Sequence, residues 1–148
     1  MIDVMQKSAT PPQSPGVLRR VFSMLYDALL LLAVWFLASY LFITLTHDTS
    51  SVVMKIIYRG YLLLVSAGYF TWFWHHGGQT LAMKTWRMKL VSSQGMRITF
   101  KQALLRYIVA LFGIPFGGIG IWWALFDRDK QFLHDRIADT KIIGVFER

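Results

Sequence analysis

The chain has 148 residues, of which 55% are hydrophobic and only 16% are charged. A typical soluble domain is about 45–50% apolar and about 25% charged, so this composition excludes a water-soluble particle with an ordinary polar surface. The length suits a single domain. The net charge of +8 fits an anionic partner, either nucleic acid or the headgroups of an anionic membrane. The apolar segments described below favour the membrane and argue against nucleic acid.

The first apolar segment is residues 21–45, and it follows a polar N-terminus. Residues 1–16 include three prolines, a composition typical of a disordered tail. Residues 21–45 carry one charged side chain, that of Asp27. A helix of about 20 apolar residues crosses a bilayer, so this segment is long enough to span. It is too long for the core of a cleaved signal peptide, and we predict a retained anchor.

A second apolar segment, residues 52–74, follows a short polar turn at residues 46–51. Lys55 and Arg59 lie near its start, where long basic side chains can reach the interface. Aromatic side chains concentrate at membrane interfaces. The end of this predicted second span carries such a group: Tyr69, Trp72 and Trp74.

The segment at residues 75–102 has no acidic residue and five basic ones, Lys84, Arg87, Lys89, Arg97 and Lys101. Cytoplasmic loops carry an excess of lysine and arginine, whereas the turn at residues 46–51 has neither. We therefore predict that the N-terminus and this basic loop face the cytoplasm. Anionic lipid headgroups or a partner protein would bind the loop there.

Short strands are predicted within and after the basic loop. Residues 86–91 and 96–99 alternate in polarity around a turn signal at residues 92–95, which predicts a β-hairpin. Residues 140–146 predict another strand.

A third apolar segment, residues 103–126, contains one charged residue, Arg106. Gly113 and Gly117 have the spacing of a helix-association motif. However, Pro115 lies between them, and proline in a helix interior costs about 3 kcal/mol, so we favour a bent or broken segment. A single crossing would place the C-terminus outside. A re-entrant turn, which we favour, would place it inside and let residues 140–146 pair with residues 86–91.

Together these segments predict an all-α helical membrane protein. It has two full transmembrane helices, a third membrane segment broken by glycine and proline, and a small cytoplasmic β element.

Asp27 is the most informative single residue, because it lies about 9 Å into the first span. A carboxylate inside a bilayer costs several kcal/mol unless it is paired, hydrated or protonated. Arg20 shares its helix face, and Arg106 enters the bilayer from the same side. We predict an Asp27–Arg106 pair with Arg20 close by, and with His75 or His76 near it. A structural ion pair that locks two helices is the simpler interpretation, and a protonatable or ion-binding site is the functional one.

Other chemistry is not indicated. The chain contains no cysteine, so thiol chemistry and disulfides are excluded. His75 and His76 point to different helix faces, and no third residue has the sequence spacing of a metal ligand with them. No nucleophile–base arrangement stands out, so we expect no enzyme, metal or cofactor. The acidic residues near the C-terminus are expected to form a solvated face rather than a cation site: Asp127, Asp129, Asp135 and Asp139.

The order of these features resembles the RDD family of bacterial membrane proteins, which is named for one arginine and two aspartates. Arg20 precedes Asp27 by seven residues, as in the first element of the family. Residues 78–83, Gly-Gln-Thr-Leu-Ala-Met, resemble the stretch after the second span, with Ala82 where the family pattern has glycine. Residues 103–106, Ala-Leu-Leu-Arg, and residues 133–140, Leu-His-Asp-Arg-Ile-Ala-Asp-Thr, resemble the later elements.

The resemblance covers residues 17–146 and implies a bacterial inner-membrane location. It identifies Asp135 as the second aspartate of the family pattern, with His134 and Thr140 in the same motif. Transport has been suggested for the family, whose molecular role is largely undefined.

Two functions are therefore left by the sequence. The first is transport of an ion or small solute through a buried Asp/Arg site, which would require a homo-oligomer, because two spans and a broken third enclose no pathway. The second is a non-catalytic adaptor or scaffold whose basic loop binds anionic lipid or a partner protein.

Overall fold

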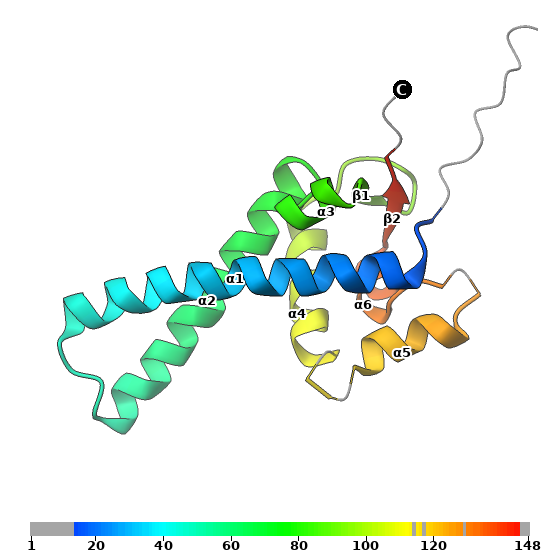
Figure 1. Ribbon diagram of the computed structural model, residues 1–148. Coiled ribbons are helices and arrows are strands. Elements are labelled where there is room, and N and C mark those ends of the chain that lie inside the picture. The colour runs from blue at the N-terminus through cyan, green and yellow to red at the C-terminus, as the bar shows by residue number, and fades with distance from the viewer. Residues whose placement is uncertain (1–13, 114, 117, 129, 146–148) are drawn as a thin grey trace, which may run out of the picture.

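The computed structural model describes residues 14–113, 115–116, 118–128 and 130–145 (Figure 1). Most of the predicted disordered tail, residues 1–13, lies outside the described part of the chain. The elements follow the order α1 (Val17–Thr46), α2 (Val52–His76), α3 (Leu81–Thr85), β1 (Met88–Ser92), α4 (Phe100–Gly113), α5 (Ile119–Phe126), α6 (Leu133–Ile137) and β2 (Thr140–Gly144).

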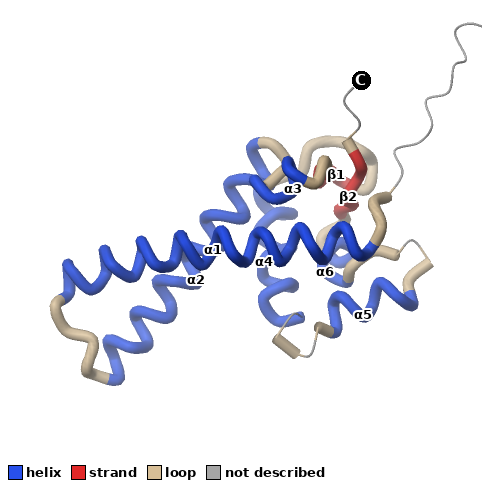
Figure 2. Tube along the Cα trace, viewed as in Figure 1, coloured by secondary structure: helices blue, strands red, loops and turns tan. Residues whose placement is uncertain are grey.

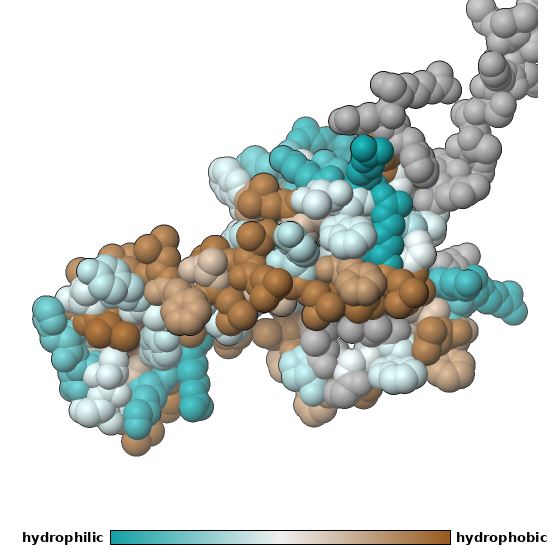
Figure 3. Space-filling model, in the orientation of Figure 1, coloured by the Kyte–Doolittle hydropathy of each residue, from teal (hydrophilic) through white to brown (hydrophobic). Residues whose placement is uncertain are grey.

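The long arm of the molecule is a helical hairpin made of α1 and α2. These helices have 30 and 25 residues, or about 45 and 38 Å at 1.5 Å per residue, and both are apolar enough to cross a membrane. Large apolar side chains such as Phe36 and Leu64 are exposed on the arm. Figure 3 shows hydrophobic surface along the middle of the arm and a mixed surface at its tip. Both predicted spans are therefore present as helices, and α1 begins four residues earlier than the predicted 21.

Hydrogen bonds between polar side chains hold the two helices of the hairpin together. Trp35 Nε1 donates to Ser66 Oγ at 2.8 Å, and the hydroxyl oxygens of Ser39 and Tyr58 lie 2.6 Å apart. Such bonds join helices where lipid removes the hydrophobic drive for association. At the turn, the Ser51 hydroxyl accepts from the backbone N–H of Met54 and caps α2.

The two strands form a small antiparallel sheet near the N-terminal half of α1 (Figure 2). Leu90 of β1 lies opposite Ile142 of β2, so the pairing expected between the C-terminal strand and the strand in the basic loop is present. The predicted hairpin with residues 96–99 is wrong. Thr99 and Gln102 instead exchange hydrogen bonds in a capping box that starts α4, so the local signal there belongs to a helix.

The buried core lies between the sheet, the end of α2 and the start of α4. It includes Trp74, Leu90, Ile98 and Ala103. Trp74 is only 7% exposed, whereas Trp72 is 61% exposed. The predicted interfacial aromatic group is therefore wrong for Trp74, which packs inside the protein because it lies on the face of α2 that meets α4.

The third apolar segment is broken, as predicted. The helices α4 and α5 have 14 and 8 residues, about 21 and 12 Å, and each is shorter than a bilayer core of about 30 Å. A Cβ atom at Gly113 would lie 3.8 Å from Gly120 Cα, so the end of α4 and the start of α5 approach closely. A single continuous helix over residues 103–126 is thus excluded, and Figure 1 shows α4 steeply inclined to α1.

A tight turn at Gly78 joins α2 to α3 and lies against β1 of the small sheet. Its φ of +68° is in the left-handed region, and a Cβ atom there would lie 2.4 Å from Leu90 O. Gly78 O also accepts a hydrogen bond from Leu90 N at 2.7 Å. Only glycine fits this position without moving β1.

The substitution Gly78→Ala should therefore lower the thermal stability of the detergent-solubilised protein. The left-handed backbone alone costs a residue with a side chain about 1–2 kcal/mol, and the clash with Leu90 O adds to this. Thermal unfolding followed by tryptophan fluorescence measures the effect. Gly68→Ala in α2, where an added Cβ meets nothing within 4 Å, is the matched control and should cause no loss. Equal behaviour of the two variants would contradict the role of Gly78.

Candidate functional site

A cluster of ionisable side chains is buried where α1, α4 and α6 meet. We call it the buried charge cluster, and its members are Arg20, Asp27, Arg106, His134 and Asp135. None is more than 7% exposed. Charged side chains are almost never buried to this extent unless they are paired, so the partners of each one matter.

Asp135 is at the centre of the cluster and is completely buried. One carboxylate oxygen, Oδ1, forms an ion pair with Arg106 of α4, and the other, Oδ2, lies 3.9 Å from Arg20 Nη1 of α1. Arg20 also donates a hydrogen bond to the backbone carbonyl of Lys130. Arg106 Nη1 donates to the Thr140 hydroxyl oxygen at 3.4 Å. A single carboxylate thus joins two helices to the C-terminal segment.

The predicted Asp27–Arg106 ion pair is wrong. Among the described residues, the acidic partner of Arg106 within ion-pair distance is Asp135. The physical reason is that α6 packs against α4 and brings Asp135 to the guanidinium from a segment that is distant in sequence. The prediction of a solvated acidic face is also wrong for Asp135. It is wrong for Asp127 too, because that side chain is only 7% exposed and pairs with Arg136 at 2.7 Å. Asp139 is exposed as predicted, and Asp129 lies outside the described residues.

Asp27 is held by a different partner, Thr80. The Thr80 hydroxyl donates to Asp27 Oδ2 at 2.7 Å, and its oxygen accepts from the backbone N–H of Met83 at the start of α3. The other oxygen, Asp27 Oδ1, is buried and has no hydrogen-bond partner in the described part of the chain. Sequence reasoning missed Thr80 as a site residue, although its place before Leu81 is that of a helix cap.

Two aromatic rings support the guanidinium groups. Arg20 lies over the ring of Phe132 at 4.7 Å, and Arg106 lies over the ring of Trp74 at 4.8 Å. A cation over a desolvated ring gains up to about 2 kcal/mol, which offsets part of the cost of burial. Neither ring was predicted in the site, because nothing in the local sequence of Phe132 or Trp74 indicates an arginine partner.

His134 is the histidine of the cluster. Burial lowers the pKa of its imidazole well below the usual value, and the positive charges of Arg106 and Arg20 lower it further. It is therefore neutral in the folded protein. The predicted neighbours His75 and His76 lie elsewhere: His75 Nδ1 is 3.3 Å from Ile98 O, and His76 stacks on Trp72.

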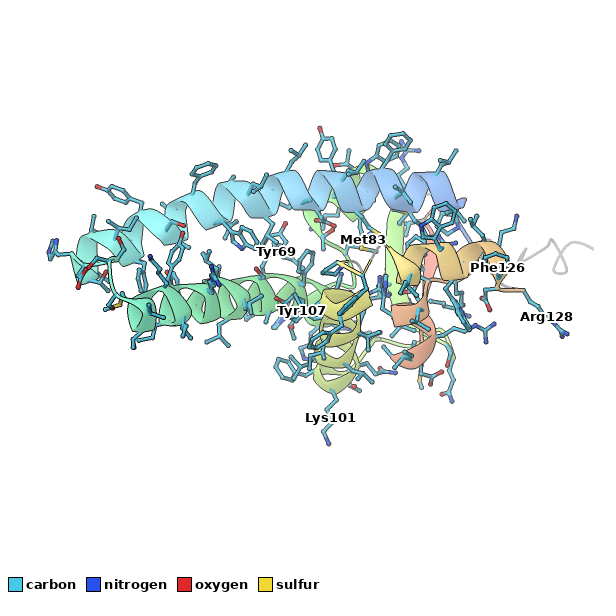
Figure 4. All side chains as sticks on the ribbon, turned by 90° about the horizontal axis from the view of Figure 1, so that it is seen from below. Tyr69, Met83, Lys101, Tyr107, Phe126 and Arg128 are labelled. Carbon is cyan, nitrogen blue, oxygen red and sulfur yellow. The ribbon has the colours of Figure 1, made fainter. Side chains whose placement is uncertain are left out.

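A cavity of about 310 Å³ adjoins the cluster. Along α1 its wall changes from Arg20 and Asp27 to Leu31 and Trp35, so one end is polar and the other apolar. Figure 4 shows two further lining residues, Met83 and Tyr107, between the helices, with Lys101 and Arg128 directed outward. Over the described residues, no group of three or more metal-binding side chains is placed to hold a metal ion.

The predicted basic residues are not part of the cluster. Lys84, Arg87, Arg97 and Lys101 are exposed, and Lys89 is half-buried. A hydrophilic surface is visible over α3 and the sheet in Figure 3. The structure therefore separates two polar features, one internal and balanced in charge, the other external and basic.

Replacing Asp135 by asparagine should destabilise the fold strongly. Asp135→Asn keeps the shape of the side chain and leaves both guanidinium groups uncompensated, which typically costs about 3–5 kcal/mol for a broken buried pair. The free energy of unfolding in mixed detergent micelles is the measurement. The control is Asp139→Asn, which alters an exposed aspartate four residues away and should change stability little. Similar losses in both variants would refute the central role of Asp135.

Comparisons with known proteins identify the family of the chain. The model of the RDD family matches residues 14–139, a range that contains all five members of the buried charge cluster. An uncharacterized protein of Rickettsia prowazekii (strain Madrid E) is 36% identical to this chain over 105 residues, which is 70% of this chain and 58% of that protein. The match thus spans just over half the length of this relative. No solved structure matches. On the family match, the chain belongs to the RDD family of membrane proteins.

Proposed function

We propose that the protein transports an ion or small solute across the bacterial inner membrane, with Asp27 as the group that takes up and releases a proton. One observation carries the proposal. Asp27 lies in an apolar helix, lines the internal cavity, and keeps one carboxylate oxygen without a hydrogen-bond partner among the described residues. Ionisable residues inside membrane segments commonly mark transport pathways.

The proposed orientation has the N-terminus, the sheet and the basic residues on the cytoplasmic side. The positive-inside rule supports it, because most of the exposed lysines and arginines lie near the N-terminal half of α1. Two exposed basic residues, Lys55 and Arg59, lie at the other end of the hairpin, and none occurs in the turn between α1 and α2. In this orientation α4 and α5 form a re-entrant segment. Irregular backbone at such a depth requires cover by protein or water. The close approach of Gly113 and Gly120 and the packing of α6 on α4 and α5 provide protein cover.

The cluster suggests how a pathway is kept closed. A polar groove of about 440 Å³ is lined by Asp135, Asp139 and Lys141, and Asp135 also pairs with Arg106, which lines the internal cavity. We take this ion pair as the barrier between the groove and the cavity. The cluster contains two arginines and two aspartates, and its formal charge is zero with His134 neutral. Uptake of a proton by Asp27 leaves an excess positive charge that weakens this closed arrangement.

A homo-oligomer is part of the proposal. Within the described part of the chain, one copy has two helices long enough to span, and two helices alone form no pathway across a bilayer. We assign no catalytic step and no cofactor.

Proton flux into proteoliposomes, read by an enclosed pH-sensitive dye under an imposed sodium or potassium gradient, tests the proposal. Wild type should show flux, and Asp27→Asn should abolish it, because asparagine cannot take up the proton. Asp48→Asn is the matched control, since it removes an exposed carboxylate from the turn between the spans and should leave flux unchanged. Equal flux in wild type and Asp27→Asn, or no flux in either, would remove the proposal.

The alternative function is a non-catalytic adaptor that binds anionic lipid through its basic surface. The exposure of Lys84, Arg87, Arg97 and Lys101 favours it, because each basic residue near an anionic leaflet is worth about 1 kcal/mol.

Charge removal tests the adaptor. The triple variant Lys84→Gln, Arg87→Gln and Lys101→Gln should retain less phosphatidylglycerol than wild type when nanodisc-reconstituted protein is released and weighed by native mass spectrometry. Lys55→Gln, on the opposite part of the hairpin, serves as the control. Unchanged lipid retention in the triple variant would count against this function.

A further inference from the structure

Some polar atoms in the wall of the cavity have hydrogen-bond partners and others do not. Four of its lining side chains each have a buried polar atom without a hydrogen-bond partner among the described residues, and the atoms are Arg20 Nε, Asp27 Oδ1, Trp74 Nε1 and Arg106 Nε. Three of these atoms are donors and one is an acceptor. Arg20, Asp27 and Arg106 are more than nine-tenths buried. Buried polar atoms are normally hydrogen-bonded, so a polar ligand or ordered water would be stabilised at this group.

Other polar side chains in the cavity wall already have hydrogen-bond partners. Trp35 Nε1 donates to Ser66 Oγ, and the Tyr107 hydroxyl donates to Leu63 O at 3.1 Å. Leu31 and Phe70 add apolar wall. The cavity therefore has one end that needs hydrogen bonds and a length of wall that needs apolar contact.

Water alone does not suit this cavity. A volume of about 310 Å³ would take about ten waters at about 30 Å³ each, and most of them would lie against apolar side chains. Apolar cavities remain dry, and waters persist where they find two to four polar partners. The polar end could hold one or two waters, but the apolar length calls for a hydrocarbon.

We propose that this cavity binds a single-chain amphiphile with a neutral headgroup that both donates and accepts hydrogen bonds, such as a protonated medium-chain carboxylic acid or an alcohol. The headgroup accepts from the guanidinium groups of Arg20 and Arg106 and donates to Asp27 Oδ1. The chain lies along Leu31 and Trp35. The volume is at the low end of the range for ligand pockets, about 300–1,000 Å³, so it matches a single alkyl chain.

The charge of the cluster selects the headgroup. The two arginines and two aspartates already balance, so a permanently charged headgroup would bring an uncompensated charge into a buried site. A quaternary ammonium group would meet both guanidinium groups and could donate nothing to Asp27. This inference shares its site with the proposed transport function and names the class of solute that the site takes. Binding needs no gradient, so each can fail without the other.

Photolabelling tests the inference in the full chain in nanodiscs. The probe is a ten-carbon carboxylic acid with a terminal diazirine, and labelled residues are located by peptide mass spectrometry. Label should reach Leu31 and Trp35, which line the cavity, and an excess of decanoic acid or decanol should remove it. Leu29 and Leu37 on the exposed face of α1 report labelling from the bilayer, which these competitors should not reduce specifically.

Two further experiments test separately the selectivity for the headgroup and the binding of the alkyl chain in the cavity. Decyltrimethylammonium should not compete, and Ala110→Phe, which fills the cavity from α4, should lose the competable label. Leu104→Phe, on a partly exposed part of α4 that does not line the cavity, should keep it. Equal competition at the cavity and exposed positions, no label at Leu31 and Trp35, or competition by decyltrimethylammonium would overturn the inference. Should Ala110→Phe fail to fold, the wild-type competition decides the question alone.

Discussion

Asp135 has no contact with solvent, and its two carboxylate oxygens face guanidinium groups from two different helices. Each arginine reaches this carboxylate from a largely apolar helix, and both share it as a counter-charge. The interaction is also topological. It joins α1, near the beginning of the chain, to α4 in its middle and to α6 near its end. The packing of α6 on α4, the position of Thr140 beside Arg106 and the return of β2 to β1 are all consistent with this one contact.

Burial of such a cluster has a price that packing must offset, and the structure contains several contributions. The rings of Phe132 and Trp74 lie against the guanidinium groups, which also donate hydrogen bonds to a backbone carbonyl and a hydroxyl oxygen. The compensation is incomplete, because Nε of both arginines and Oδ1 of Asp27 lack partners in the described part of the chain. A purely structural ion pair would gain from satisfying these atoms. Their presence at the wall of a cavity is what gives the cluster a functional interpretation rather than only a structural one.

The two polar features of the molecule support different functions. The internal cluster is charge-balanced and adjoins a space of molecular size, which favours binding and transport of a solute. The external lysines and arginines lie on the surface and favour anionic lipid. The two proposals are compatible in one protein, because the basic surface and the cavity are separate parts of the molecule.

The sequence by itself determined the elements whose cause is local. Hydrophobic length predicts α1 and α2, and the run of glycine and proline predicts the break between α4 and α5. The pattern of Arg20, Asp27 and Asp135 resembles the RDD family, to which the chain belongs. The sequence also identified Asp27 and Arg106 as buried charges that need partners.

The partners themselves were decided by the tertiary structure. Asp135 comes to Arg106 through the packing of α6, Thr80 comes to Asp27 through the turn at Gly78, and Trp74 turns inward because α4 covers it. Residues 96–99 show the same limit, because their alternation suits a strand until the capping box with Gln102 starts a helix. Hydrophobic periodicity reports which side chains avoid water, whereas the choice of partner for a buried charge depends on contacts between segments that are distant in sequence.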